Sequence, residues 1–364
     1  KLLLGIWRPA RGSVRLDGVE LSDWNHDDVG PRLGYVPQEI DFHEGTVADN
    51  IARLGTVDAQ QVVAAAQAIQ AGLGDVFLAG GVESMTRAPF VFAKPDGAFP
   101  RGNLTGYDST LGWRFVNDRL SALYEPISMG ETAENLAEKY QISRTAQEAF
   151  AVESHRRAVA AIEKGYFKEQ ILPIELKTRK GVTVFDTDEH PRKDASLEGM
   201  AKLRAAFKKD GSVTAGNASG INDGAAAVVL MEKAAAAQKG LKPMARLVSY
   251  GIAGVDPKIM GIGPVPACNQ ALARAGLKIG DIDVVEANEA FAVQAMAVAC
   301  DLKFDAAKTN PNGGAVGLGH PIGATGALVT VKALYELQRT GGKYALVTMC
   351  IGGGQGIAAI FERM

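Results

Sequence analysis

The run Asn310-Pro-Asn-Gly-Gly-Ala-Val-Gly-Leu-Gly-His320-Pro-Ile-Gly-Ala-Thr-Gly326 is the most informative part of the chain. Its glycines and prolines predict an irregular loop, and the Ala/Val/Leu-rich residues 324–337 that follow predict a helix. His320 is therefore expected near a helix N-terminus, where the helix dipole disfavours a protonated ring. Because a neutral imidazole can accept a proton near pH 7, His320 is a candidate base.

A second glycine-rich turn lies near the end of the chain, in Met349-Cys350-Ile-Gly-Gly-Gly-Gln-Gly356. The apolar residues 344–349 predict a strand, so Cys350 is placed where a strand meets a turn. A substrate can reach a thiol in such a position, and the N–H groups exposed by the glycines can stabilise an oxyanion. Cys350 is therefore a second candidate catalytic residue.

Two more segments combine small residues with a polar side chain. Asn288 lies in Val285-Glu-Ala-Asn-Glu-Ala-Phe-Ala292, which predicts a strand-to-helix corner, and Ser219 lies in Thr214-Ala-Gly-Asn-Ala-Ser-Gly-Ile-Asn-Asp-Gly224. Structural interpretations stay open for all four features: a helix cap for Asn288, a plain connection for the Ser219 loop, a hydrogen-bonded structural role for His320 and a core position for Cys350. Their occurrence in one chain favours a functional site.

Strand-like and helix-like segments alternate along most of the chain, which indicates a layered α/β architecture. Gly80 and Gly81 are expected to close a short strand, and the capping box of Ser128 and Glu131 predicts a helix start. The predicted strands are 75–79, 225–231, 245–250, 284–285 and 344–349. The predicted helices include 58–72, one that starts at Ser143, one that begins after residue 231 and ends at 239, one that passes through Leu272, one that starts at Glu289, and 324–337.

The composition is that of an ordinary globular protein, with 39 basic and 41 acidic residues among 364 and 47% apolar residues. A net charge of −2 offers no broad basic surface, so nucleic acid and membranes are not expected partners. Three cysteines, Cys268, Cys300 and Cys350, cannot form a disulfide framework, which predicts free thiols and a cytoplasmic location. No phosphate loop, metal-ligand spacing, signal peptide or apolar run of membrane-spanning length is found.

Together these segments resemble the thiolase family of acyl-CoA C-acyltransferases, from about residue 65 to residue 364. Two further matching runs are Ala79-Gly-Gly-Val-Glu-Ser-Met-Thr-Arg-Ala-Pro89 and Met129-Gly-Glu-Thr-Ala-Glu-Asn135. The resemblance implies a layered α/β/α/β/α fold with an inserted loop domain and a complete C-terminal domain. It also implies thiolytic cleavage of 3-oxoacyl-CoA, or the reverse Claisen condensation of acetyl-CoA, in fatty acid metabolism such as β-oxidation.

The resemblance assigns a role to each candidate residue. His320 would activate a nucleophilic thiol as a base, and Cys350 would be the acid/base that moves the α-proton or protonates leaving CoA. Asn288 would position a water and, with His320, bind the thioester oxyanion, while the N–H of Gly352 would serve a second oxyanion hole. Ser128 replaces a histidine that some members have, which argues against short-chain acetoacetyl-CoA specificity.

The resemblance also predicts how CoA is bound. CoA or acyl-CoA would be the substrate, with no permanently bound cofactor and no metal, and the chain would form a homodimer or homotetramer. The run Gly112-Trp-Arg-Phe-Val-Asn117 is similar to thiolases that act on longer or dicarboxylic 3-oxoacyl-CoA substrates. The residues that fall where the family lines its CoA tunnel are Ser219, Ala215, Phe207, Met129, Arg192 and Phe291.

The first 61 residues depart from the thiolase pattern. The family carries its acyl-accepting cysteine in a Cys-Gly-[Ser/Ala]-Gly segment just before the helix that ends here at Gly72. The corresponding position is Gly55, and no cysteine precedes Cys268. Residues 1–61 instead resemble an internal fragment of an ABC-transporter ATPase, through residues 2–18 and the run Gly34-Tyr-Val-Pro-Gln38, without its phosphate loop, signature motif or Walker B strand.

We therefore expect four parts: an ABC-ATPase-like fragment at 1–61, the remainder of an incomplete thiolase N-terminal domain at 62–85 and 212–241, a loop domain for CoA binding and oligomerisation at 86–211, and a C-terminal domain at 242–364. Within the first part, Asp17-Gly18 predicts a hairpin, residues 33–36 a strand and Thr46 a helix start. Three functions stay open: a thiolase-family acyltransferase impaired by the missing nucleophile, a non-catalytic CoA-binding remnant or fusion artefact of a chimeric sequence, and an ABC-type nucleotide-binding module.

Overall fold

The computed structural model describes residues 15–16, 19–20, 23, 58–95, 97–99, 101–179 and 181–364. The hairpin predicted around Asp17-Gly18 is confirmed, because β1 (Arg15–Leu16) and β2 (Val19–Glu20) pair antiparallel. The predicted strand at 33–36, the helix after Thr46 and the position of Gly55 lie outside the described residues. The ATPase resemblance of residues 1–61 stays a prediction.

A mixed sheet of four strands forms the centre of the described part. Its order is β10 (Val284–Ala287), β11 (Tyr344–Ile351), β12 (Gln355–Arg363) and β9 (Ala245–Gly254). β10 and β11 are parallel, and β12 runs antiparallel to both β11 and β9. The almost wholly buried β11 is apolar apart from Thr348 and the terminal Tyr344, as expected for a strand with both faces covered. The predictions of strands at 245–250, 284–285 and 344–349 are confirmed, and each strand extends further.

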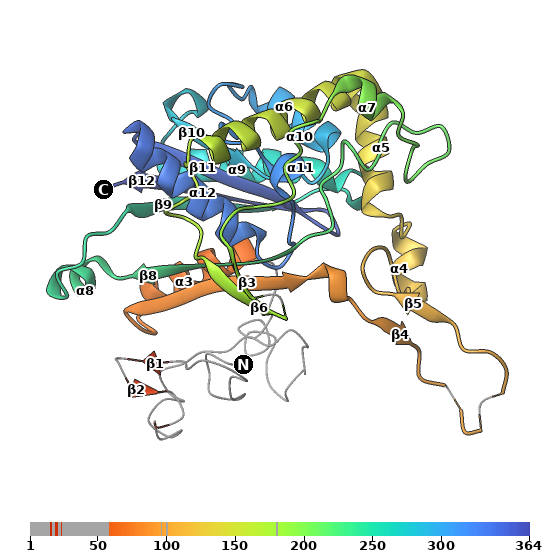
Figure 1. The fold of residues 1–364 in the computed structure, drawn as a ribbon, viewed down its shortest axis with the longest axis horizontal. Coiled ribbons are helices and arrows are strands. Elements are labelled where there is room, and N and C mark those ends of the chain that lie inside the picture. Colours follow the sequence, from red (N-terminus) through yellow and green to blue (C-terminus); the bar gives the residue numbers. More distant parts are fainter. Residues whose placement is uncertain are drawn as a thin grey trace.

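Helices cover both faces of this sheet (Figure 1). On one face lie α9 (Pro264–Ala275) and α10 (Ala292–Leu302), whose apolar residues pack with Val285, Leu346 and Ile360. On the other lie α12 (Thr325–Thr340) and α3 (Asp58–Gln70), which pack with Val284 and Val347. Successive strand residues thus point to opposite cores, as the twofold period of a strand requires.

A two-stranded antiparallel ladder, β3 (Val76–Ser84) with β8 (Asp223–Met231), lies on the far side of α3 and α12. The resulting layers confirm the predicted mixed α/β architecture. The prediction that Gly80-Gly81 would end the first strand is wrong, because the strand continues to Ser84. Gly80 fits closely against β8, since a Cβ at this position would lie 2.5 Å from the Ala226 carbonyl oxygen. The order of helix, strand and antiparallel strand in α3–β3–β8 recurs in α12–β11–β12.

Residues 85–222 are inserted between β3 and β8. The capping box of Ser128 and Glu131 begins α5 as predicted, and Ser143 caps α6. The elements of this insertion are the 3₁₀ helix η3 (Met85–Arg87), β4 (Phe90–Phe92), β5 (Gly106–Asp108), α4 (Asp118–Leu123), α5 (Met129–Tyr140), α6 (Arg144–Glu163), β6 (Ile174–Thr178), β7 (Gly181–Phe185) and α7 (Leu197–Ala201). Outside the insertion, the short helices are α8 (Lys233–Gln238), η4 (Pro257–Ile262), η5 (Ile279–Asp281) and α11 (Ala315–Leu318).

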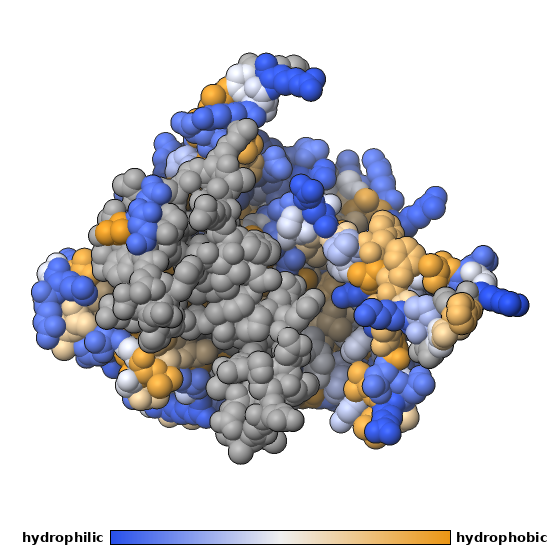
Figure 2. Space-filling model, turned by 90° about the horizontal axis from the view of Figure 1, so that it is seen from below, coloured by the Kyte–Doolittle hydropathy of each residue, from blue (hydrophilic) through white to orange (hydrophobic). Residues whose placement is uncertain are grey.

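The β4–β5 hairpin and the loop at its tip project from the body as an arm (Figure 1). Apolar side chains on this arm are open to solvent, including Phe90 at 69%, Phe99 at 92% and Leu123, in the adjacent α4, at 77% exposure. Hydrophobic colour gathers on the corresponding right-hand side of Figure 2. Within the described ranges, no helix combines the length and apolar composition needed to cross a bilayer.

Candidate active site

Asn288 lies where the sheet ends, directly after β10. Its backbone N–H donates to the Thr348 carbonyl oxygen at 2.9 Å, which places it beside the end of the parallel strand β11. Its side chain is 3% exposed, and its Nδ2 lies 3.4 Å from His320 Nε2. Its Oδ1 is buried with no hydrogen-bond partner in the described structure. A buried acceptor without a partner is costly, so this atom is suited to a water or substrate group that donates to it.

The helix predicted from Glu289 begins later than expected. α10 starts at Ala292 with Phe291 as its N-cap residue, so Asn288 does not cap the helix. Residues 288–291 instead form a non-helical corner, because the backbone of this corner pairs with another segment: the Ala290 carbonyl accepts from Ser219 N–H at 3.0 Å and the Ala292 N–H donates to the Asn217 carbonyl at 2.8 Å. The two predicted polar segments are thereby joined.

His320 is held in one tautomer by its neighbours. Its Nδ1 lies 2.8 Å from Thr325 Oγ1, and the Thr325 hydroxyl donates its proton to the Pro321 carbonyl at 2.8 Å. Nδ1 must therefore carry a hydrogen and donate it to Thr325, which leaves Nε2 with a free lone pair directed at Asn288. Burial lowers the pKa of His320 to about 4, so the ring is a neutral base near pH 7.

Cys350 lies at the end of β11, paired across the ladder with Gly356. Its side chain packs in one apolar group with Met129, Phe207 and Phe291. Burial raises the pKa of the Cys350 thiol to about 12. The group is consequently a protonated thiol near neutral pH, suited to giving a proton and poor as a nucleophile.

The turn after Cys350 leads into β12 as the glycine run predicted. Gly353 and Gly354 have φ of +83° and +92°, a backbone region that favours glycine. Gly352 is exposed, and a Cβ there would lie 3.7 Å from Met129 Sδ. The Gly352 backbone therefore lies at the edge of the apolar group around Cys350.

The residues predicted to contact CoA are only partly brought together. The rings of Phe207 and Phe291 meet edge to face with centroids 5.9 Å apart, and Met129 belongs to the same apolar group. Ser219 joins this group through its bond to the backbone of Ala290. Ala215 and Arg192 are exposed and lie outside the apolar group.

The other two thiols belong to neither the Asn288–His320 pair nor the apolar group around Cys350. Cys268 is fully buried in α9, in the core between that helix and the central sheet, and burial raises its pKa to about 12. Cys300 is exposed near the end of α10. All three thiols are free, as predicted, and Cys350 alone belongs to the apolar group beside Phe291.

Two residues of the site were missed by sequence reasoning, although both lie in the quoted segments. Thr325 orients the His320 ring, and Asn222 Oδ1 accepts the His320 backbone N–H at 3.1 Å. Their residue types carried a signal, because Thr and Asn commonly bind nearby backbone groups in loops. The distance in sequence between Asn222 and His320 hid that pairing.

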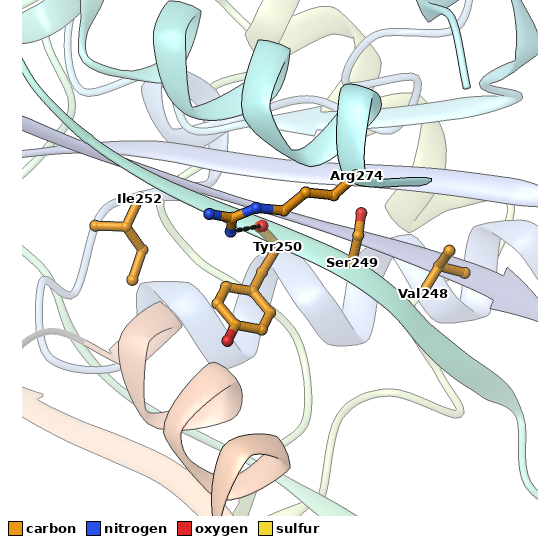
Figure 3. A pocket seen from close by; sticks show the side chains of 5 residues that line it. All are labelled: Val248, Ser249, Tyr250, Ile252 and Arg274. Atoms are coloured by element: carbon orange, nitrogen blue, oxygen red, sulfur yellow. Dashed lines mark hydrogen bonds between the residues drawn. The ribbon is translucent and has the colours of Figure 1, made fainter. Parts of the chain in front are cut away.

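A separate hollow of about 390 Å³ lies on the outer edge strand β9, lined by Val248, Ser249, Tyr250, Ile252 and Arg274 (Figure 3). Arg274 donates to the Tyr250 carbonyl at 2.6 Å, and the Tyr250 hydroxyl accepts from Gln67 at 2.7 Å. Part of the polar surface of this hollow is thus paired within the chain. It does not include His320, Asn288 or Cys350.

Comparison with known proteins gives matches along most of the chain. A family model described as the thiolase N-terminal domain matches residues 37–234, and one described as the thiolase C-terminal domain matches residues 241–363. The first match begins before residue 65, where the sequence resemblance was placed. The chain is 60% identical over 309 residues to beta-ketothiolase BktB of Cupriavidus necator, covering 84% of this chain and 76% of that protein.

Other similar proteins also match along most of the chain. A beta-ketoadipyl-CoA thiolase of Acinetobacter baylyi is 50% identical over 320 residues, covering 87% of this chain and 80% of the relative. The crystal structure of the Bacillus anthracis acetyl-CoA acetyltransferase superposes with a TM-score of 0.77 at 46% identity, covering 84% and 76% of the two chains. The crystal structure of human mitochondrial 3-ketoacyl-CoA thiolase in complex with CoA superposes with a TM-score of 0.77 at 43% sequence identity, and the match covers 84% of this chain and 75% of that chain.

Proposed function

The chain belongs to the thiolase family, and we propose from this premise that it catalyses proton transfer at the α-carbon of acetyl-CoA, the carbon-acid half of a thiolase reaction. The observation that carries the proposal is the meeting of Asn288 and His320 at the end of the sheet, where the Asn288 N–H donates to Thr348, two residues before the buried thiol of Cys350. Such a site can move a proton and bind the negative charge that develops.

In the proposed step, the thiolate form of Cys350 removes a proton from the acetyl methyl group. The electron pair of the broken C–H bond enters the enolate, whose charge rests on the thioester oxygen. Asn288 Nδ2–H donates towards that oxygen, and the Gly352 N–H serves a second oxyanion position. Return of a solvent-derived proton from the Cys350 thiol restores acetyl-CoA.

His320 has a different part in this proposal. Its Nε2 lone pair can accept a proton from the thiol of CoA, and only the ring protonated there can donate a hydrogen bond to an oxyanion. Because Nδ1 is committed to Thr325, the neutral ring acts as a base and not as a donor. Asn288 therefore carries oxyanion stabilisation whenever His320 is neutral.

We also propose that this chain has little or no thiolysis activity. The full reaction stores an acyl group on a nucleophilic thiol between two half-reactions, and no second thiol lies with Cys350. Burial raises the pKa of Cys350 to about 12, so its thiol is mainly protonated near pH 7 and is a poor replacement for that nucleophile.

For the substrate, we propose CoA thioesters with longer or dicarboxylic acyl groups, bound along Met129, Phe207, Phe291, Ser219, Ala215 and Arg192. The run 112–117 and the relatives named as beta-ketoadipyl-CoA thiolases support this class. The exposed apolar arm supports the predicted homodimer or homotetramer, because large exposed apolar patches are typical of protein contact surfaces.

The deciding experiment measures deuterium entering the acetyl group of acetyl-CoA in D₂O by mass spectrometry. We expect the wild-type chain to exceed Cys350→Ala by on the order of 10²-fold, the lower range of general acid–base catalysis, and to accelerate as pH rises because the thiolate fraction grows. Equal rates for wild type and Cys350→Ala, in chains shown to be folded and to bind CoA, would refute the assignment.

Thermal-shift titration separates the remaining alternatives. A ligand that binds only the folded state stabilises it by about 2.7 kcal/mol at a hundred times Kd. Stabilisation by CoA without proton exchange would indicate a non-catalytic CoA-binding remnant. Stabilisation by ATP but not CoA would indicate the nucleotide-binding module, for which the phosphate loop is missing from the sequence.

A further inference from the structure

Asn288 and His320 lie on two irregular segments that regular secondary structure does not fix relative to one another. Asn288 belongs to the corner between β10 and α10, and His320 follows α11, which has only four residues. The backbone joins the two segments at their base, where Val285 bridges to Thr309, and the 3.4 Å approach between the two side chains beyond that point is supported by side-chain bonds.

Glu289, the residue after Asn288, makes the first set of these bonds. Its side chain is 2% exposed and turns towards the loop that carries His320. Its Oε1 accepts from Asn310 Nδ2 at 2.8 Å, and its Oε2 accepts from the Val316 N–H at 3.2 Å. Asn310 in turn exchanges two bonds with the backbone of Ala287, at 2.9 and 2.8 Å, so both ends of the corner are tied to the loop.

Ser154 of α6 completes the arrangement from a third element. Its hydroxyl donates to Glu289 Oε2 at 2.6 Å and accepts from the N–H groups of Gly314 and Gly317, both at 3.1 Å. Close approach here requires glycine, because a Cβ on Gly314 would lie 2.1 Å from Glu289 Cδ and one on Gly317 would lie 2.8 Å from the Ser154 carbonyl oxygen. The loop is thus shaped to fit this pair.

We propose that Glu289 and Ser154 are positioning residues that set the distance between Asn288 and His320. This inference rests on the proposed function for its catalytic consequence, but the geometry it concerns can be measured without catalysis. Neither residue touches the reacting atoms. Their effect is transmitted through the backbone of residues 314–317 and through the covalent link from Glu289 to Asn288.

The bonding pattern requires a carboxylate and not merely a polar side chain of similar shape. Glu289 meets three donors, namely the Ser154 hydroxyl, the Asn310 amide and the Val316 N–H. Burial raises the pKa of Glu289, and these three bonds oppose the rise because only an ionised carboxylate can accept all of them. Glutamine would direct an NH₂ group at one of these donors in either orientation. Glu289→Gln therefore preserves volume and reverses a hydrogen bond.

The experiment compares Glu289→Gln with wild type and with Glu148→Gln, a matched control. Glu148 is also buried, at 4% exposure, lies on the same helix as Ser154 and is paired with Arg144 at 2.7 Å. The first readout is the pH titration of the His320 ring nitrogens by NMR with ¹⁵N-histidine, assigned through His320→Gln. The second is acetyl-CoA exchange in D₂O.

We expect the His320 ring to stay neutral to a pH of about 4 in wild type and Glu148→Gln, because burial lowers its pKa. In Glu289→Gln, water that reaches the loosened ring should move the titration towards the ordinary value near 6.5. Exchange should fall by on the order of 100-fold, as misplacement by about 1 Å does in other enzymes. Ser154→Ala should change both readouts in the same direction, and Ser154→Thr, which restores a hydroxyl, should recover part of the loss.

Each outcome decides the inference. An unchanged His320 titration in folded Glu289→Gln and Ser154→Ala would overturn it, as would an equal change in Glu148→Gln. If Glu289→Gln does not fold, Ser154→Ala alone gives the same test. Failure of the proposed function would give a different result. Wild type would then show no acetyl-CoA exchange, while Glu289→Gln and Ser154→Ala would still show a shifted His320 titration.

Discussion

Replacing Lys332 by Met should expose the energetic cost of a charge buried behind the active-site loop. Lys332 Nζ lies 2.8 Å from Glu286 Oε2 and donates to the Gly313 carbonyl at 2.6 Å. The side chains of the ion pair are 7% and 1% exposed. Lys332→Met leaves Glu286 without its counter-ion, and breaking a buried pair in this way costs about 3–5 kcal/mol.

The loss in the free energy of unfolding caused by Lys332→Met should grow as pH rises. Burial raises the pKa of Glu286 to about 7 even though Lys332 opposes the shift, so loss of Lys332 must raise it further. A carboxyl group whose pKa is raised by folding contributes stability at low pH and loses it as pH rises through the folded pKa. The variant should therefore lie furthest below wild type near pH 8, and the difference should shrink as pH falls and Glu286 takes up a proton.

Urea unfolding at pH 5, 6.5 and 8 measures the free energy of unfolding of the variant and of wild type. Lys193→Met is the matched control, because Lys193 pairs with Glu163 at the same 2.8 Å with both side chains more than half exposed, and a surface pair contributes at most about 1 kcal/mol. The double variant Glu286→Gln with Lys332→Met should regain much of the loss. A deficit below about 1 kcal/mol at pH 8, or one equal at pH 5 and 8, would refute this reasoning.

Two further predictions concern the site and the surface. Thr325→Val removes the acceptor that holds His320 Nδ1–H, so the ring should populate the Nε2–H tautomer in ¹⁵N spectra. Because Nε2–H can then donate to the enolate oxygen, acetyl-CoA exchange should rise by up to about tenfold, on the scale of one hydrogen bond; spectra identical to wild type would contradict the tautomer assignment. Sedimentation velocity should give a mass of two or four chains, and Phe90→Ser with Leu123→Ser on the arm should reduce it; a single-chain mass for wild type would contradict the proposed association.

The sequence was informative wherever a residue type and its local neighbours decide the structure. The capping box at Ser128, the cap at Ser143 and the turn glycines 353 and 354 were all readable because capping and positive φ depend on residues within one turn. The candidate residues His320, Asn288 and Cys350 were found for the same reason, since each stands out against small residues.

Interactions between distant segments could not be read in this way. Gly80-Gly81 resembled a strand end, yet both residues continue β3 because β8, more than a hundred residues later, supplies alanines that fit against them. Glu289 resembled the first residue of a helix, but its side chain accepts hydrogen bonds from Ser154 and Asn310. These outcomes follow from tertiary bonds that local propensity does not encode.

The recurrence of a helix, a strand and an antiparallel strand has a consequence for how the chain folds. In the C-terminal copy, the loop that closes the β11–β12 ladder is residues 352–354, whereas in the other copy the β3–β8 ladder closes around residues 85–222. Since closure entropy grows with the logarithm of loop length, the second ladder costs about 3 kcal/mol more to close from an unstructured chain. Pulsed hydrogen exchange should therefore protect β11 and β12 before β3 and β8, and the reverse order would contradict the argument. We therefore expect the C-terminal hairpin to form before the ladder that joins the two ends of the insertion.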